Sequence, residues 1–151
     1  MTIKERIMSN NCSYSDFCNL FEESCNKFSS KNAIVDLKNA KGYTFAQIFQ
    51  RAQEVQKILV KLGIKRHNRV AVISQHSACN ICLAYAGFTV VLLDVSLPVD
   101  ELNNLIEFSD VSAFFVSPEM YSKIEKRLFN NLPVLIIQSN FQYELLENFT
   151  V

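Results

Sequence analysis

Glycine is scarce in this chain of 151 residues, which contains only Gly42, Gly63 and Gly87. Loops that cradle phosphate groups use several clustered glycines, because only then can consecutive backbone N–H groups approach the ligand closely. Three isolated glycines cannot form such a loop. The sequence therefore excludes a complete glycine-rich nucleotide site within these residues.

The chain also lacks an excess of charge of either sign, with 15 Lys and Arg against 15 Asp and Glu. Without net charge there is no long-range field to attract nucleic acid or an anionic membrane, so we expect neither as a partner. The longest uncharged run, Ser77 to Leu93, spans 17 residues and contains Asn80 and Gly87. A transmembrane helix needs about 20 mostly apolar residues, so we expect no membrane span.

The amino-terminal segment, MTIKERIMSNN, has no apolar core of the kind found in signal peptides. A cytoplasmic location is the expectation. The sequons at Asn11 and Asn148 would then stay unglycosylated, and the five cysteines would be reduced thiols.

The composition favours a packed globular body, since 49% of the residues are hydrophobic and 12 are Phe. Predicted strands alternate with predicted helices along the chain. This order is typical of a layered α/β fold with a mostly parallel sheet and helices on both faces. We expect a flexible amino terminus over residues 1–12 and a single α/β domain over residues 13–151.

The stretch from Arg69 to Pro98 is the predicted centre of that domain. Arg69–Ser74 is a short β-branched run that suits a strand buried on both faces. A mostly covered helix follows and ends at Gly87, and Phe88–Leu93 predicts a second buried strand. Together they form a βαβ unit with a right-handed crossover.

The flanking elements follow from spacing and capping residues. Before the centre, we predict a helix from Tyr14 that lies across the start of the sheet, capped by Ser13 or Ser15, then a hairpin over residues 33–45. Thr44 and Gln47 match a capping box, which begins a helix that stops at Gly63. After the centre, the predictions are a helix from Pro98 that buries Val99, Leu102, Leu105 and Ile106, strands at 113–116 and 132–137, a helix start at Ser117-Pro118-Glu119, and a weakly helical tail from Gln138 to Val151.

Asp94 is the best candidate for a site residue, because ligands of open α/β sheets collect at the carboxyl ends of strands. The alternative, which its turn-forming context favours, is a loop carboxylate that orders the next turn. Cys79 and Cys82 form a C-x-x-C pair, but the sequence offers no second close pair for zinc. The pair also lies inside an apolar helix rather than at its amino end, so we interpret both thiols as core residues.

The remaining polar groups give no stronger signal. His76 follows a strand end but has no nucleophile partner in the sequence. Glu22 and Glu23 are adjacent and would diverge by about 100° on a helix. Lys61, Lys65, Arg66 and Arg69 surround a predicted helix end, where cations are stabilising and solvated. We therefore predict no catalytic, cofactor-binding or metal-binding residue in this chain.

Three segments, read in order, resemble motifs of the adenylate-forming ligases, which comprise acyl-CoA synthetases, luciferases and the adenylation domains of nonribosomal peptide synthetases. Residues 43–48, YTFAQI, resemble "(L)TYxEL". Residues 63–73, GIKRHNRVAVI, resemble "Gv.pGDrVai". Residues 83–94, LAYAGFTVVLLD, resemble "lLKAGxAYvPLD", and the following SLP with Glu101 and Leu102 resembles "P.eRl". The resemblance runs from about Tyr14 to Ile137 and is strongest to the peptide-synthetase adenylation domains and related acyl-AMP ligases.

This chain departs from the motifs at several positions. The family's Lys-Ala-Gly is Tyr85-Ala86-Gly87 here, its Pro-Leu-Asp is Leu92-Leu93-Asp94, and its Gly-Asp is His67-Asn68. In the family, the Ser/Thr/Gly-rich phosphate loop and the domain with the catalytic lysine come after the position of Ile137.

The resemblance implies an enzyme that uses ATP and Mg²⁺ to convert an amino or fatty acid to acyl-AMP. We expect this chain to be a structural, catalytically incomplete part of it, truncated before the phosphate loop. Its partner would be the remainder of the ligase, a complementary chain or a second copy. A non-catalytic α/β interaction module remains the alternative.

Overall fold

The computed structural model describes residues 2, 5, 9, 13–37, 40–74, 78–137 and 143–145. Most of the predicted flexible segment 1–12 therefore lies outside the described residues, as does His76. The elements in chain order are α2 (Tyr14–Lys27), β1 (Asn32–Asp36), β2 (Lys41–Thr44), α3 (Phe45–Lys61), β3 (Arg69–Ile73), α4 (Ala78–Ala86), β4 (Thr89–Leu92), α5 (Val99–Phe108), β5 (Ala113–Val116), α6 (Pro118–Lys123), the 3₁₀ helix η1 (Lys126–Phe129), β6 (Val134–Ile137) and β7 (Tyr143–Leu145).

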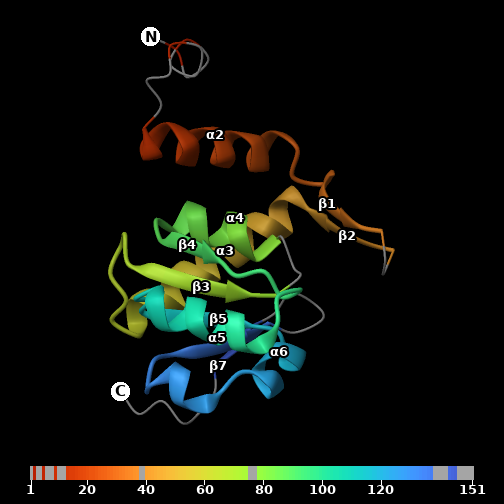
Figure 1. Ribbon diagram of the computed structural model, residues 1–151. Helices are drawn as coiled ribbons and strands as arrows, with labels where there is room; N and C mark the ends of the chain where they lie inside the picture. The colour runs from red at the N-terminus through yellow and green to blue at the C-terminus, as the bar shows by residue number, and fades with distance from the viewer. Residues whose placement is uncertain are drawn as a thin grey trace.

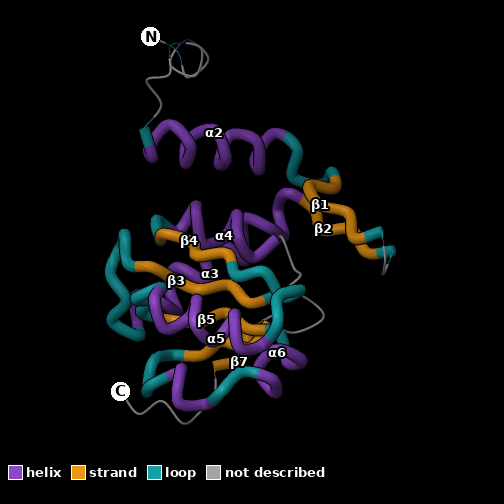
Figure 2. The backbone as a smooth tube through the Cα atoms, in the orientation of Figure 1, coloured by secondary structure: helices purple, strands orange, loops and turns teal. Residues whose placement is uncertain are grey.

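A five-stranded sheet in the order β4-β3-β5-β6-β7 forms the centre of the molecule. The first four strands are parallel, and β7 runs antiparallel to β6. Figure 2 shows helices on both sides of this sheet. The predicted layered α/β fold with a mostly parallel sheet is confirmed.

Strand β7 corrects the prediction of a weakly helical tail. Its three residues pair with β6, and Leu135 lies opposite Leu145. The edge of β6 offers unpaired backbone groups, and pairing with them outweighs a marginal local helical preference. The rest of the tail lies outside the described residues.

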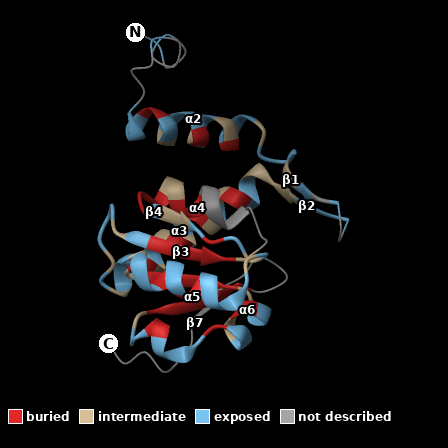
Figure 3. Ribbon diagram, viewed as in Figure 1, coloured by how far each residue is buried: buried red, intermediate tan, exposed pale blue. Residues whose placement is uncertain are grey.

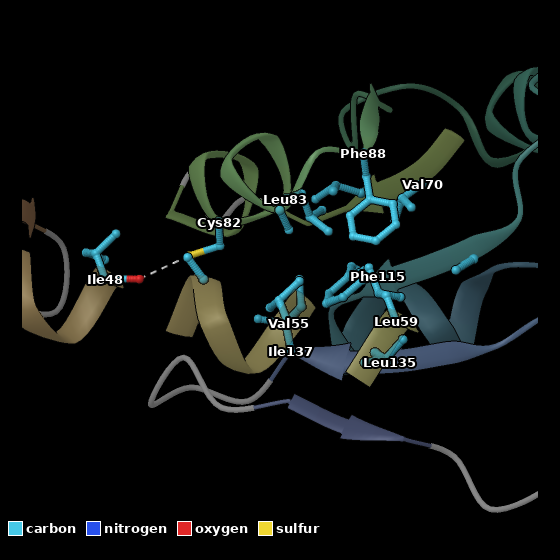
Figure 4. Packing of buried hydrophobic residues seen from close by; sticks show 14 of the residues in the cluster. Ile48, Val55, Leu59, Val70, Cys82, Leu83, Phe88, Phe115, Leu135 and Ile137 are labelled. Atoms are coloured by element: carbon cyan, nitrogen blue, oxygen red, sulfur yellow. Dashed lines mark hydrogen bonds between the residues drawn. The ribbon is translucent and has the colours of Figure 1, made fainter. Parts of the chain in front are cut away.

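Strands β3, β5 and β6 are buried on both faces because their side chains alternate between two apolar clusters. The cluster under α3 and α4 contains Val70, Val72, Phe115 and Leu135 (Figure 4). The cluster under α5, α6 and η1 contains the intervening residues of the same strands, among them Ala71, Ile73, Phe114, Val116 and Ile136. Figure 3 shows the resulting red band of buried residues through the middle of the sheet.

Strand β4 is present as predicted but is not buried along its length. It lies at the edge of the sheet, and its Leu92 side chain is 64% exposed. Phe88 and Leu93, immediately outside the strand, are the buried residues of this segment. The predicted buried strand over residues 88–93 is therefore buried only at its two ends, since composition does not reveal which strand of a sheet stands at its edge.

Both amino-terminal helices begin as the sequence predicts. Ser13 rather than Ser15 caps α2, forming a capping box with Asp16, and Thr44 forms the predicted box with Gln47 at the start of α3. The position of α2 differs from the prediction, because it packs on the layer formed by α3 and α4 (Figure 1). The Phe21 ring lies 6.2 Å from Phe49 of α3 and 5.1 Å from Tyr85 of α4, measured between ring centres.

Helix α5 buries only part of the face that was predicted. Leu102 and Ile106 are buried as expected, but Leu105 is 44% exposed and Val99 is 37% exposed. Asn103 is buried instead, and its amide donates to the Glu125 carboxylate at 3.4 Å. The segment before η1 thus supplies an acceptor for the Asn103 amide nitrogen, whereas the Asn103 Oδ1 is buried without a hydrogen-bond partner among the described residues.

No helix in the described part of the chain is both long enough and apolar enough to cross a bilayer.

Candidate functional site

Three parallel strands end in polar residues at the same edge of the sheet. Ser74 follows β3, Asp94 lies two residues after β4 and Ser117 follows β5. The Asp94 carboxylate accepts hydrogen bonds from the Ser96 N–H at 2.9 Å and from the Ser96 hydroxyl at 2.7 Å. These two bonds lower the pKa of Asp94, and the Ser117 side chain caps α6. Asp94 thus stabilises a local turn, and Ser117 the start of a helix.

Cys25 and Cys82 are packing groups. Cys82 is buried, and its Sγ donates to the Ile48 carbonyl at 3.7 Å (Figure 4). Cys25 is also buried, and that burial raises its thiol pKa. The Cys79 side chain lies outside the described residues. Within the described ranges, no group of three or more His, Cys, Asp or Glu side chains is placed to hold a metal ion.

The basic residues near the end of α3 engage neighbouring groups separately. The Arg66 guanidinium stacks 4.8 Å from the centre of the Tyr14 ring. Arg69 instead pairs with Asp110, with 3.1 Å between Nη1 and Oδ2. These two guanidinium groups are thus each engaged by a different neighbour.

A polar contact that the sequence did not reveal joins α2 to α4. The Tyr85 hydroxyl donates to the Glu22 carboxylate at 2.7 Å, and the Tyr14 hydroxyl donates to the Tyr85 carbonyl. Burial, followed by the contact with Glu22, raises the Tyr85 pKa. Tyr85 occupies the position where the family motif has lysine, so this departure now has a structural explanation: the tyrosine anchors α2. No periodicity or motif could have paired it with Glu22, which lies 63 residues earlier.

Gly87 is required at the same junction. Its φ of +88° is in the left-handed region, and an added Cβ would lie 2.8 Å from Arg66 Nε. Gly63 has a similar φ of +77°, but an added Cβ there would meet open space. Gly87 therefore allows Arg66 and Tyr14 to pack against the end of α4.

The described residues line two hollows on the surface. One, of about 230 Å³, is an almost wholly apolar groove between α2, β1 and the start of α3. We call it the α2 groove; it is lined by Phe17, Leu20, Phe21, Ser24, Ala33, Ile34, Phe45 and Ile48. The other, of about 500 Å³, lies between the end of α5 and η1 and contains Glu107, Asp110 and Arg127. Arg127 is already paired with Glu107 and Glu125, so this hollow presents no free cation and no pair of a nucleophile and a base among the side chains described.

The open parallel sheet, covered by helices on both faces, defines the class as an α/β protein of the kind found in the amino-terminal domains of adenylate-forming enzymes. The model of the AMP-binding enzyme family matches residues 21–147. This chain belongs to that family.

Individual relatives support the assignment. The chain is 29% identical over 87 residues to 2-succinylbenzoate–CoA ligase from Oceanobacillus iheyensis, a match that covers 55% of this chain and 18% of the relative. Its fold is similar to the luciferase-like enzyme of the mealworm Zophobas morio, with a TM-score of 0.69, 23% identity and coverage of 82% of this chain and 31% of that one. A benzoate CoA ligase from Burkholderia xenovorans gives a TM-score of 0.69 at 15% identity, and the match covers 83% of this chain and 26% of the ligase. The chain thus spans less than a third of the length of these relatives.

Proposed function

We propose that this chain is a structural part of an adenylate-forming ligase whose intact form activates an amino or fatty acid with ATP to acyl-AMP. Its contribution is the parallel sheet β4-β3-β5-β6 with its covering helices. The observation that carries the proposal is the family match over residues 21–147, together with the parallel sheet shared with the ligases.

We further propose that the chain alone is catalytically incomplete. Its three glycines cannot form the phosphate cradle that ATP needs, and two of them, Gly63 and Gly87, serve helix ends instead. The described residues also hold no carboxylate cluster for Mg²⁺. ATP and Mg²⁺ therefore do not fit the residues described here.

Exchange of labelled pyrophosphate into ATP tests the incompleteness. We expect no exchange above the rate without protein when the folded 151-residue chain is incubated with ATP, Mg²⁺ and a panel of amino, aryl and fatty acids. Circular dichroism on the same sample verifies that the chain is folded. Acid-dependent exchange that survives repurification would overturn the proposal, because a chain without a phosphate cradle has no means of forming an adenylate.

The second candidate function is a non-catalytic interaction module that binds a partner chain. The α2 groove favours it, since Phe17 is 37% exposed and Leu20 is 42% exposed beside an apolar hollow. Exposed apolar patches of this kind commonly mark interaction sites.

An environment-sensitive apolar dye tests the second candidate. A module with an accessible groove should bind the dye, and Leu20→Ser should reduce the fluorescence at least about twofold by shrinking the apolar surface. Val60→Ser is the matched control, because Val60 is 60% exposed on α3 and does not line the groove. Equal fluorescence from the parent chain and Leu20→Ser would count against the module.

A further inference from the structure

Strand β4 leaves one edge of the sheet open. The N–H groups of Thr89 and Leu93 face β3, where they donate to Asn68 O at 3.0 Å and Val72 O at 3.1 Å. Because backbone groups alternate in direction along a strand, those of Val90 and Leu92 face away from β3. No other described strand pairs with them, so this edge offers a short row of hydrogen-bonding groups.

Apart from being short, at four residues, the open edge of β4 carries no charged residue, proline or bulge that would hinder strands from pairing between molecules. Charged residues, prolines and bulges commonly protect edge strands. The other described strands at an edge each carry a charge, at Asp36 in β1, Lys41 in β2 and Glu144 in β7. Strand β4 is Thr-Val-Val-Leu, and it belongs to an uncharged run that extends back through α4.

We propose that β4 pairs with β4 of a second copy of this chain, in antiparallel orientation about a two-fold axis. A two-fold interface brings each patch against itself, so any charge within it would face a like charge. A patch free of charge avoids that repulsion, which makes a second copy the occupant that suits this edge. The proposal is independent of the ligase assignment and remains testable if that assignment fails.

The alternation of backbone groups specifies the register. Residues with outward-facing groups must form the hydrogen-bonded pairs, so Val90 lies opposite Leu92 of the second copy and Leu92 lies opposite its Val90. Val91 lies on the two-fold axis, opposite Val91 of the second copy. This register forms about four backbone hydrogen bonds. It also brings the Leu92 side chain, 64% exposed in the single chain, beside Val90 of the second copy on the same face of the sheet.

Light scattering after size-exclusion chromatography tests the dimer. The parent chain, of 17.3 kDa, should elute with about twice that mass at a concentration of ~100 μM. Leu92→Lys should raise the dissociation constant at least about tenfold, because it places an ammonium group in the interface and loses the apolar pair. Val60→Lys is the matched control: Val60 has a similar exposed fraction, 60%, but lies on α3, so the dimer should persist. A monomeric parent, or a dimer that tolerates Leu92→Lys, would overturn the proposal.

A disulfide tests the register. A cysteine at position 91 should form a covalent dimer under mild oxidation, because antiparallel residues that form no hydrogen bonds have close Cβ atoms. Val60→Cys and the parent chain, treated alike, control for the native thiols. Covalent dimer formed equally by Val91→Cys and Val60→Cys would contradict the register.

Discussion

Phe115→Ala is expected to destabilise the chain by about 3–5 kcal/mol, a large part of the roughly 5–15 kcal/mol that holds a domain folded. Phe115 lies on β5, in the middle of the sheet, and is fully buried in the cluster under α3 and α4. Its removal loses apolar burial and leaves a cavity that neighbouring β-strands cannot close. Urea unfolding followed by circular dichroism measures the loss as a lower transition midpoint.

Phe108→Ala provides the matched control for that experiment. The residue type and the substitution are the same, but Phe108 lies at the end of α5 with 87% of its surface exposed. We expect the free energy of unfolding of the Phe108→Ala variant to stay within about 0.5 kcal/mol of that of the parent chain. Equal losses for the two variants would mean that Phe115 does not occupy the core of the folded chain.

Ala52→Glu is expected to cost on the order of 4 kcal/mol or more and to leave little folded protein. Ala52 is fully buried on α3, within the cluster that joins α3, α4 and the sheet. A glutamate there would overfill the packed interior and bury a carboxylate for which the cluster supplies no cation. Far-ultraviolet circular dichroism and soluble yield at 25 °C report the loss.

Gln53→Glu introduces the same side chain one residue later on the same helix. Gln53 is exposed, so the carboxylate stays in water and stability should change by less than about 0.5 kcal/mol. If Ala52→Glu folded as well as Gln53→Glu, the assignment of the buried face of α3 would be wrong.

The motifs that identify the family turn out to be structural at the positions described. Thr44 caps α3, Gly63 and Gly87 follow helix ends with positive φ, and Asp94 orders a turn with Ser96. Such roles depend on backbone geometry, which explains why the fold is shared by enzymes of only 15–23% identity to this chain. The departure at Tyr85 shows the same principle, because the new side chain has acquired its own partner on α2.

Local sequence was sufficient for most of the elements, since caps, apolar periodicity and β-branched runs act over a few residues. The helix start at Ser13 or Ser15, the capping box at Thr44, the hairpin, and the strands β3, β5 and β6 all follow from such patterns. The scarcity of glycine is likewise a property of the sequence alone, and it is enough to exclude a complete glycine-rich phosphate loop within these residues.

Tertiary packing decided the features that depend on residues distant in sequence. It placed β4 at an edge, converted part of the tail into β7, rotated α5 so that Asn103 rather than Leu105 is buried, and set α2 on the helical layer through Glu22 and Tyr85. Each of these outcomes depends on the surface against which the element packs. A local sequence pattern carries no information about that surface. For the same reason the open β4 edge, with the exposed Leu92, is a property of the order of the strands in space and not of the β4 sequence by itself.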